Sequence, residues 1–402
     1  MAIVVQKYGG TSVRSPESRE LIVNKVKQLV EQKKQVVLVV SAMGRKGEPY
    51  ATDSLIQLLN LNESPVSRRE LDLIMSCGEV ISTAVMTQTL LSHGIMAKSL
   101  TGYQAGMITD DCHGDARILM VNPQRIHECL DEGNVVVIAG FQGMSDQGDI
   151  TTLGRGGSDT SAVAIGEALE ADCVEIYTDV DGVMTADPRL VSDSKVLSSV
   201  TYDEVYHMAV YGAKVVDHKA VSIARRSKCP LVIKNTFTDH QGTIIADQAY
   251  LNKMNLSNPK RITAVTSHGL VRRVTMNISG HNHERLFDEM ARRDIQMDML
   301  NFSDHSQSFT ISQGQVDDLQ AICLELGFNY EMSDEQEKIT VVGFKIHHKP
   351  GIIKETIMAL TDADLEILQS SNSNTSISFL INKGDSPKAV QVLHERFQLN
   401  HL

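Results

Sequence analysis

The chain has 402 residues, 42% of them hydrophobic, and a formal net charge of −12. This length exceeds one ordinary hydrophobic core, so we expect two or three domains. The acidic excess argues against nucleic acid as a partner. No apolar run approaches membrane-spanning length and no secretion signal is recognisable, so we expect a cytoplasmic protein that binds no membrane. The six cysteines show neither a CxxC pair nor zinc spacing, which predicts buried reduced thiols and no protein-bound metal.

Up to about residue 240, short β-branched runs alternate with helical patterns. The near-continuous apolar runs 36–40, 135–139 and 174–177 are typical of strands in a sheet that is covered on both faces. Capping boxes that begin at Ser67 and Thr201 predict helix starts, and Gly94 and Gly133 predict helix ends. We therefore expect a layered α/β domain with a largely parallel sheet, whose ligands lie beyond the carboxyl ends of the strands.

A first glycine turn follows the N-terminal strand, where residues 7–12 read Lys-Tyr-Gly-Gly-Thr-Ser. Ser15 and Pro16 then predict a capped helix start. Lys7 stands at the strand end, from which it can reach into a site as a point charge; the alternative is a solvated lysine with no role. The turn lacks the spacing of a P-loop.

A second glycine turn, residues 154–159, reads Gly-Arg-Gly-Gly-Ser-Asp and opens a helix of small residues. Its glycines allow a ligand to approach the backbone, although a tight turn alone would also need them. We expect Ser158 and Asp159 to cap the helix, whose start suits anions. Arg155 adds a fork that can hold a carboxylate or a phosphate.

These turns belong to a longer series of motifs. They are residues 7–12, 41–44 (Ser-Ala-Met-Gly), 76–79 (Ser-Cys-Gly-Glu), 154–159 and 178–183 (Thr-Asp-Val-Asp-Gly-Val). In order and spacing they resemble the aspartate kinases (aspartokinases) of the amino acid kinase superfamily, and residues 45–54 resemble the monofunctional bacterial enzymes of the Bacillus type. We expect every motif to lie at a strand-to-helix turn. The resemblance implies ATP-dependent phosphorylation of the L-aspartate side chain to 4-phospho-L-aspartate, with Mg²⁺ on the nucleotide. This is the first step toward lysine, threonine, methionine and diaminopimelate.

The aspartate side chain is an anion at neutral pH and needs no general base, so catalysis reduces to positioning and charge stabilisation. The resemblance assigns catalysis to Lys7, Arg155 and Asp179. It assigns substrate binding to Ser41, Thr52, Glu79, Arg155, Gly156, Gly157 and Ser158. It assigns nucleotide binding to Lys7, Gly9, Gly10, Thr11, Ser158, Thr178, Asp179, Asp181, Met184, Arg189, Lys214 and Val215. We expect Glu79 at a helix start, where a carboxylate would suit the helix dipole even without a ligand.

The last third contains an internal repeat. Residues 273–280 align with 341–348, and residues 308–311 align with 378–381. Each copy reads strand, helix, strand, strand, helix, strand, the ferredoxin-like βαββαβ plan. Two such copies resemble ACT domains, the small-molecule sensors of amino acid biosynthesis; the alternative is that they only mediate dimerisation. We therefore expect a catalytic domain at 1–240, a linker at 241–261, and ACT domains at 262–337 and 338–402.

The resemblance also implies feedback inhibition by lysine, threonine or diaminopimelate, and a homodimer formed through the ACT domains. Only the second copy keeps the Pro-Gly loop of the family, since the first reads Gly-His-Asn-His at 280–283. We expect the effector contacts at Lys349, Pro350, Gly351, Ile352, Asn372 and Asn374. Two departures are Asp217-His218, where many relatives have a proline, and Lys234, where relatives often have Arg.

Two other functions fit parts of the sequence. One is a kinase of the same superfamily that acts on acetylglutamate or a nucleotide; the Glu79–Arg155 pair and the tandem repeats argue against it. The other is a catalytically silent amino acid sensor. The presence of Lys7, Thr52 and Asp179 argues against that function.

Overall fold

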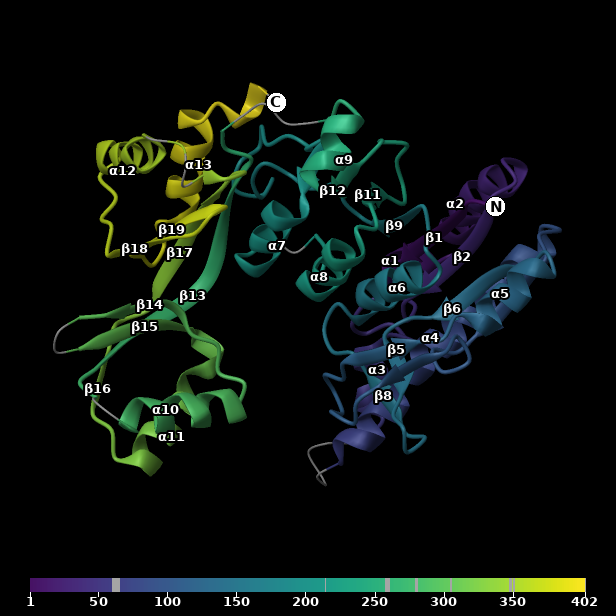
Figure 1. The fold of residues 1–402 in the computed structure, drawn as a ribbon, viewed down its shortest axis with the longest axis horizontal. Coiled ribbons are helices and arrows are strands. Elements are labelled where there is room, and N and C mark those ends of the chain that lie inside the picture. The colour runs from purple at the N-terminus through teal and green to yellow at the C-terminus, as the bar shows by residue number, and fades with distance from the viewer. Residues whose placement is uncertain are drawn as a thin grey trace. The chain divides into compact units, whose positions relative to one another are not determined.

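The computed structural model describes residues 1–59, 66–213, 215–256, 261–278, 281–303, 306–346, 349 and 351–401. The chain divides into two compact units, whose elements are labelled in Figure 1. The first unit comprises residues 1–183, 196–209 and 214–258, and the second comprises 184–195, 210–213 and 259–402. Lys214, Gly280 and Pro350 lie outside the described residues.

The first unit is built on an eight-stranded sheet. Its strands, in spatial order, are β10 (Ser199–Thr201), β12 (Thr243–Ala246), β11 (Leu231–Asn235), β9 (Cys173–Thr178), β1 (Ile3–Tyr8), β2 (Gln35–Val40), β6 (Val135–Ala139) and β3 (Ala97–Leu100). All pairs are parallel except β11 with β12, so the predicted, mainly parallel sheet is confirmed. A four-stranded sheet has the order β5 (Ile118–Val121), β4 (Met107–Thr109), β7 (Gln142–Met144) and β8 (Ile150–Thr152).

The helices of the first unit begin and end largely where their sequence signals lie. They are α1 (Gly10–Val13), α2 (Pro16–Glu31), α3 (Thr52–Gln57), α4 (Arg68–Ser92), α5 (Gln124–Asp131), α6 (Gly157–Ala168), α7 (Tyr202–Val210), α8 (His218–Ser227) and α9 (Gln248–Lys253). The Ser15 side chain caps α2 and the Ser67 side chain caps α4. Thr201 and Glu204 form a reciprocal capping box at α7. Gly94 and Gly133 follow α4 and α5 at positive φ, as predicted.

Helix α4 departs from the sequence analysis in one respect that matters for the site. Glu79 lies in the middle of this 25-residue helix, not at a helix start. Of the described helices, α4 alone has the length and composition of a membrane span. It is nevertheless a core helix, because Met86 and Leu90 are buried against the sheet and the carboxylates of Asp72 and Glu79 are buried with them.

Two further expectations were wrong. Residues 241–261, predicted as a linker, contribute strand β12 and helix α9 to the first unit. The polar residues that suggested a linker lie at caps and turns; Asp247, for example, caps α9. Not all thiols are buried, because Cys77 and Cys112 are exposed. Burial raises the pKa of the Cys229 thiol to about 12.

The second unit contains a seven-stranded sheet in the order β14 (Asp298–Phe302), β15 (Gln307–Ser312), β13 (Ala264–Met276), β17 (Gln336–Val342), β19 (Ser376–Asn382) and β18 (Gln369–Asn372), with β16 (Tyr330–Met332) paired to β13. Helices α10 (His281–Arg292) and α11 (Val316–Leu326) belong to the first repeat, and α12 (Ile352–Asp362) and α13 (Ser386–Arg396) to the second. A short 3₁₀ turn, Gln313–Gln315, precedes α11, and another, Leu399–His401, follows α13.

Strand β13 serves both repeats. Its second half pairs with β15 and β16, and its first half pairs with β17. Among the described residues the second repeat has no fourth strand of its own after α13, and the first half of β13 takes that place in its sheet. The βαββαβ plan is therefore complete in the second repeat only with the first half of β13, and the predicted boundary at 337/338 assigns Ile262 and Val265 to the first ACT domain although they lie in the core of the second repeat.

A segment between β9 and β10 is built into the second unit. Ala186 and Val191 are buried in the same apolar cluster as Ile339 and Phe379. The Thr185 hydroxyl lies 2.9 Å from Nε2 of the buried His394 on α13, and the Val265 N–H donates to the Thr185 carbonyl. Residues 184–195 therefore depend on the core of the second repeat for their conformation.

Candidate active site

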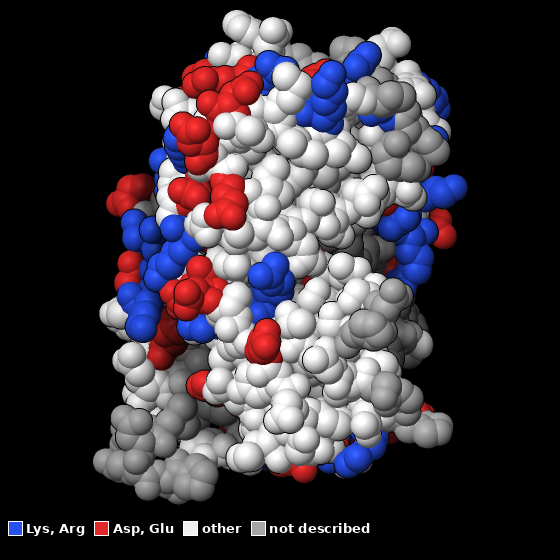
Figure 2. Space-filling view, turned by 90° about the vertical axis from the view of Figure 1, so that its left-hand side faces the viewer, with Lys and Arg blue, Asp and Glu red and all other residues white. Residues whose placement is uncertain are grey.

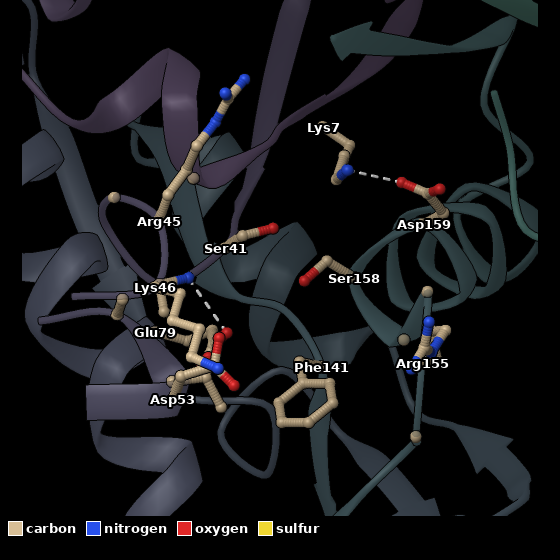
Figure 3. Close-up of a pocket in the computed structure, with 18 residues that line it drawn as sticks. Lys7, Ser41, Arg45, Lys46, Asp53, Glu79, Phe141, Arg155, Ser158 and Asp159 are labelled. Atoms are coloured by element: carbon tan, nitrogen blue, oxygen red, sulfur yellow. Dashed lines mark hydrogen bonds and ion pairs between the residues drawn. The ribbon is translucent and has the colours of Figure 1, made fainter. Parts of the chain in front are cut away.

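A cavity of about 330 Å³ lies beyond the carboxyl ends of β1 and β2 and at the start of α6 (Figure 3). Its lining residues are Lys7, Gly10, Ser41, Ala42, Gly44, Arg45, Lys46, Ala51, Thr52, Asp53, Glu79, Phe141 and Gly154 to Asp159. In Figure 3 the hydroxyl groups of Ser41 and Ser158 point toward the middle of the cavity. The cavity brings together the two glycine turns and every predicted substrate-binding residue.

The two glycine turns are joined by an ion pair. Lys7 Nζ lies 2.6 Å from Asp159 Oδ1, and both side chains are almost fully buried (Figure 3). Asp159 lies in the first turn of α6 and does not cap it, and neither does Ser158: the N-cap residue is Gly156, with φ of 74° and no side-chain cap. The predicted capping role was therefore wrong for both residues. The Gly157 and Asp159 N–H groups donate to the carbonyls of Gly154 and Gly156, and α6 presents its N-terminal end to the cavity.

The glycines are required by close packing. A Cβ atom on Gly10 would lie 2.5 Å from the Ala42 carbonyl oxygen, and the Gly44 N–H donates to the Gly10 carbonyl. A Cβ atom on Gly156 would lie 2.5 Å from the Asp217 side chain. Asp217 in turn caps α8, accepting from the Lys219 N–H, so the departure from proline at this point supplies a helix cap.

Glu79 has an unusual electrostatic environment. Its side chain is 3% exposed; Oε1 accepts a hydrogen bond from the Ala42 N–H, and Oε2 has no hydrogen-bond partner among the described residues. Burial raises the pKa of this carboxyl to about 8. A buried carboxylate is stable only when a positive charge or donors accompany it, so Glu79 is suited to a ligand that brings an ammonium group.

Arg155 and Phe141 complete the other side of the cavity (Figure 3). Arg155 is exposed and forms no ion pair with any other residue in the described ranges, so its guanidinium is available for an anionic ligand. Phe141 has φ of 68°, a left-handed conformation that costs a non-glycine residue about 1–2 kcal/mol and that gathers at functional sites. Its ring packs so closely on Gly157 that a Cβ atom there would lie 2.8 Å from it.

Unlike the predicted substrate-binding residues, most of the residues predicted to bind nucleotide do not line the cavity. Gly9, Thr11, Thr178, Asp179, Asp181 and Val215 belong to the first unit but do not line the cavity. Hydrogen bonds from Thr238 and Asn235 hold the pKa of Asp181 below its usual value. Met184 and Arg189 lie in the second unit, where Arg189 pairs with Asp187. Lys234 lies outside the cavity and forms an ion pair with Glu175 on the neighbouring strand.

The predicted effector residues all belong to the second unit. Gly351 is the N-cap residue of α12, with φ of 95° and no side-chain cap, while the Ile352 side chain is buried in the core. Lys349 Nζ donates to the Arg261 carbonyl. The Gly343 N–H donates to the Thr375 carbonyl, which brings the chain leading to this loop beside the turn that carries Asn374.

Sequence reasoning gave no site role to several cavity residues. They are Arg45, Lys46, Asp53, Phe141 and Asp159. Arg45, Lys46 and Asp53 lie within the 45–54 stretch that carried the resemblance, so a signal for them existed. Phe141 gave no such signal, since a positive φ cannot be read from a phenylalanine.

Comparison with known proteins places these features in a family. The amino acid kinase family profile matches residues 2–235, and an ACT domain profile matches residues 339–397. The chain is 40% identical to aspartokinase 1 of Bacillus subtilis, with all of both chains covered. It is similar to E. coli aspartokinase III in complex with aspartate and ADP (TM-score 0.79, 24% identity). It is also similar to that enzyme in complex with lysine and aspartate (TM-score 0.73, 25% identity). Each alignment with aspartokinase III covers 98% of this chain and 99% of the other.

The resemblance seen in the motifs is thus confirmed over the full length, for both the kinase domain and the ACT region. The chain belongs to the aspartokinases of the amino acid kinase family, and it is an aspartate kinase with a regulatory ACT region.

Proposed function

We propose that the cavity transfers the terminal phosphoryl group of Mg²⁺–ATP to the side-chain carboxylate of L-aspartate, giving 4-phospho-L-aspartate. Glu79 binds the α-ammonium group, Arg155 binds a carboxylate, and Lys7 faces the phosphoryl group in transfer. The observation that carries this assignment is the buried Oε2 of Glu79, which has no hydrogen-bond partner among the described residues and lies in the same cavity as Arg155. Trapping the acyl phosphate with hydroxylamine, across a panel of acidic amino acids and acetylglutamate, tests the choice of substrate.

For this reaction the protein has to position the two substrates and stabilise the charge that develops on the phosphoryl group. The attacking carboxylate is already ionised, so no general base is required, and among the cavity residues none needs to accept a proton. Lys7 lies 3.8 Å from the position that a Cβ atom on Gly9 would occupy, so its ammonium sits beside the backbone of the first glycine turn. Mg²⁺ enters with the nucleotide and neutralises phosphate charge; Thr178, Asp179 and Asp181 are proposed on the nucleotide side. The predicted role of this reaction as the first step toward lysine, threonine, methionine and diaminopimelate, and the cytoplasmic location, remain part of the proposal.

Regulation is proposed to act through the second unit. The unfilled helix start at Gly351 offers backbone N–H groups to the carboxylate of a free amino acid, and Ile352 can contribute only its backbone because its side chain is buried. Lysine, threonine and diaminopimelate are the candidates; the E. coli relative was crystallised with lysine. The nucleotide-side motif 178–183 continues directly into residues 184–195, which pack in the core of the second repeat, so that core has a covalent connection to the motif.

A homodimer is proposed through the same unit. Strands β14 and β18 stand at the two ends of the main strand order of its sheet, and unprotected edges favour pairing with another chain. Leu300 and Phe302 on β14 and Ile353 and Ile357 on α12 are exposed. Figure 2, which views the side of the molecule where α12, β18 and β14 lie in Figure 1, shows a broad area with few charged side chains. A second copy of this chain fits such a surface, in a two-fold arrangement.

Aspartate binding should release a proton near neutral pH. In the empty enzyme the carboxyl of Glu79, with a pKa of about 8, is mostly protonated at pH 7. The substrate ammonium favours the carboxylate, so binding at pH 7 should release up to about one proton, and aspartate should bind more tightly as the pH rises toward 8. Calorimetry in buffers of different ionisation enthalpy measures this release. It should vanish in Glu79→Gln; an equal release in wild type and variant would exclude Glu79.

Substitution of Arg155 and substitution of Lys7 should change different kinetic parameters. Arg155→Ala should raise the aspartate KM about 10–100-fold, because a charge-assisted hydrogen bond contributes about 1.5–3 kcal/mol. Lys7→Ala should lower kcat about 100-fold, because its charge acts mainly on the transition state. Steady-state kinetics with both substrates varied separate the two effects. A kcat for Lys7→Ala within a few-fold of wild type would contradict the assignment.

Feedback inhibition should depend on the loop at 349–352 in the second repeat more than on residues 280–283 in the first. Gly351→Val forces a β-branched residue into φ of 95° and should abolish inhibition without changing the uninhibited kcat. Asn282→Val, in the first turn of α10, is the matched control and should leave inhibition largely intact. Dose–response curves with lysine, threonine and diaminopimelate measure this. Equal loss in both variants would argue against a single effector loop.

The proposed homodimer can be tested with point variants of the full-length chain. Removing residues from 262 onward would uncover Ala186 and Val191, so a point variant is the cleaner test. Sedimentation should show a dimer at micromolar concentration for the wild type, and Phe302→Asp should weaken it while Asp288→Asn, also in the first repeat, should not. A monomeric wild type would rule out the proposed dimer.

A further inference from the structure

The cavity is lined by two cations to which no role has been given, Arg45 and Lys46. Of the basic residues that line it, Lys7 is paired with Asp159 and Arg155 is assigned to substrate. Arg45 reaches out of the 41–46 loop, and its Nη2 lies 2.7 Å from Oδ2 of Asp179, which directly follows β9. Arg45 thus connects the cavity to the motif proposed for the nucleotide, 178–183.

The backbone of Arg45 is held firmly. The preceding residue, Gly44, donates its N–H to the Gly10 carbonyl at 3.1 Å and has φ of 93°. The Arg45 N–H is 3.3 Å from a carboxylate oxygen of Glu48, and the Glu48 N–H donates back to the Arg45 carbonyl. The Arg45 backbone is therefore fixed against the same glycine turn that follows Lys7.

The far end of the side chain is held weakly. The Arg45 side chain is 64% exposed and that of Asp179 is 47% exposed. An ion pair at this exposure contributes about 0–1 kcal/mol. The phosphates of a nucleotide carry more charge and match the planar guanidinium fork, so they would displace Asp179 as its partner.

We propose that Arg45 is a catalytic residue that leaves Asp179 when nucleotide binds and places its guanidinium on the phosphoryl group in transfer, beside Lys7. In that step the bond from the terminal phosphorus to the bridging oxygen breaks, and its electron pair goes to ADP. A carboxylate oxygen of aspartate forms the new bond to phosphorus, and no proton moves. The two cations then share the charge that develops on this group. This inference rests on the proposed nucleotide position at Asp179.

The test compares Arg45→Ala and Arg45→Lys with Arg69→Ala. Arg69 is a matched control, because it too is a half-exposed arginine with Nη2 at 2.7 Å from an aspartate, Asp149, but it lies outside the cavity lining. Arg45→Ala should lower kcat about 100–1,000-fold while the aspartate KM changes less than about 3-fold. Arg45→Lys, which keeps the charge and loses the fork, should fall between. Added guanidinium ion should partly restore kcat of Arg45→Ala and should not affect Arg69→Ala.

Several outcomes separate this inference from its alternatives. If Arg45→Ala kept kcat within about 3-fold of wild type, or lost only affinity for ATP, the pair with Asp179 would be a surface contact or a binding contact, and the catalytic role would be overturned. Unchanged melting temperatures confirm that the variants are folded. A wild type that forms no aspartyl phosphate would instead refute the proposed function, before any variant is measured.

Discussion

The ion pair between Lys7 and Asp159 fixes the geometry on which the rest of the site depends. It joins the end of β1 to the first turn of α6, elements separated by about 150 residues of chain, and it is nearly shielded from water. At that burial a charge is tolerated only with a partner, so each residue holds the other in place. Because each stands in or beside a glycine turn, the pair holds both turns on one cavity. A ligand phosphate would find Lys7 already oriented, at little entropic cost.

Glu79 shows the opposite arrangement, a buried acid without a cation. The helix α4 places it in the interior, and the closest donor is one backbone N–H from the 41–44 motif. The empty protein accommodates this by raising the pKa of the carboxyl, and a substrate that carries an ammonium group relieves the cost. Selectivity for an amino acid over a simple dicarboxylate would follow from the same group, because a substrate without the ammonium would leave Glu79 uncompensated.

The second unit owes its architecture to one long strand. Because β13 pairs with both β15 and β17, the two repeats share a continuous sheet. Lys338 on β17 is buried, forms an ion pair with Asp298 on β14, and lies 3.6 Å from the centre of the Tyr211 ring. Side chains from both repeats and from the 210–213 segment therefore meet at one buried charge.

Local signals in the sequence determined much of this protein. The apolar runs gave the parallel strands, the capping boxes at Ser67 and Thr201 gave helix starts, and the spaced motifs identified the family and most of the cavity residues. These features depend on residues close together in the chain. What the tertiary structure alone decided involves distant partners: Asp159 binds Lys7 instead of capping its helix, and Glu79 is buried inside α4. Residues 184–195 likewise join the core of the second repeat, because Ala186 and Val191 find their apolar contacts there. No local pattern encodes which distant surface a side chain will meet, and that choice belongs to packing.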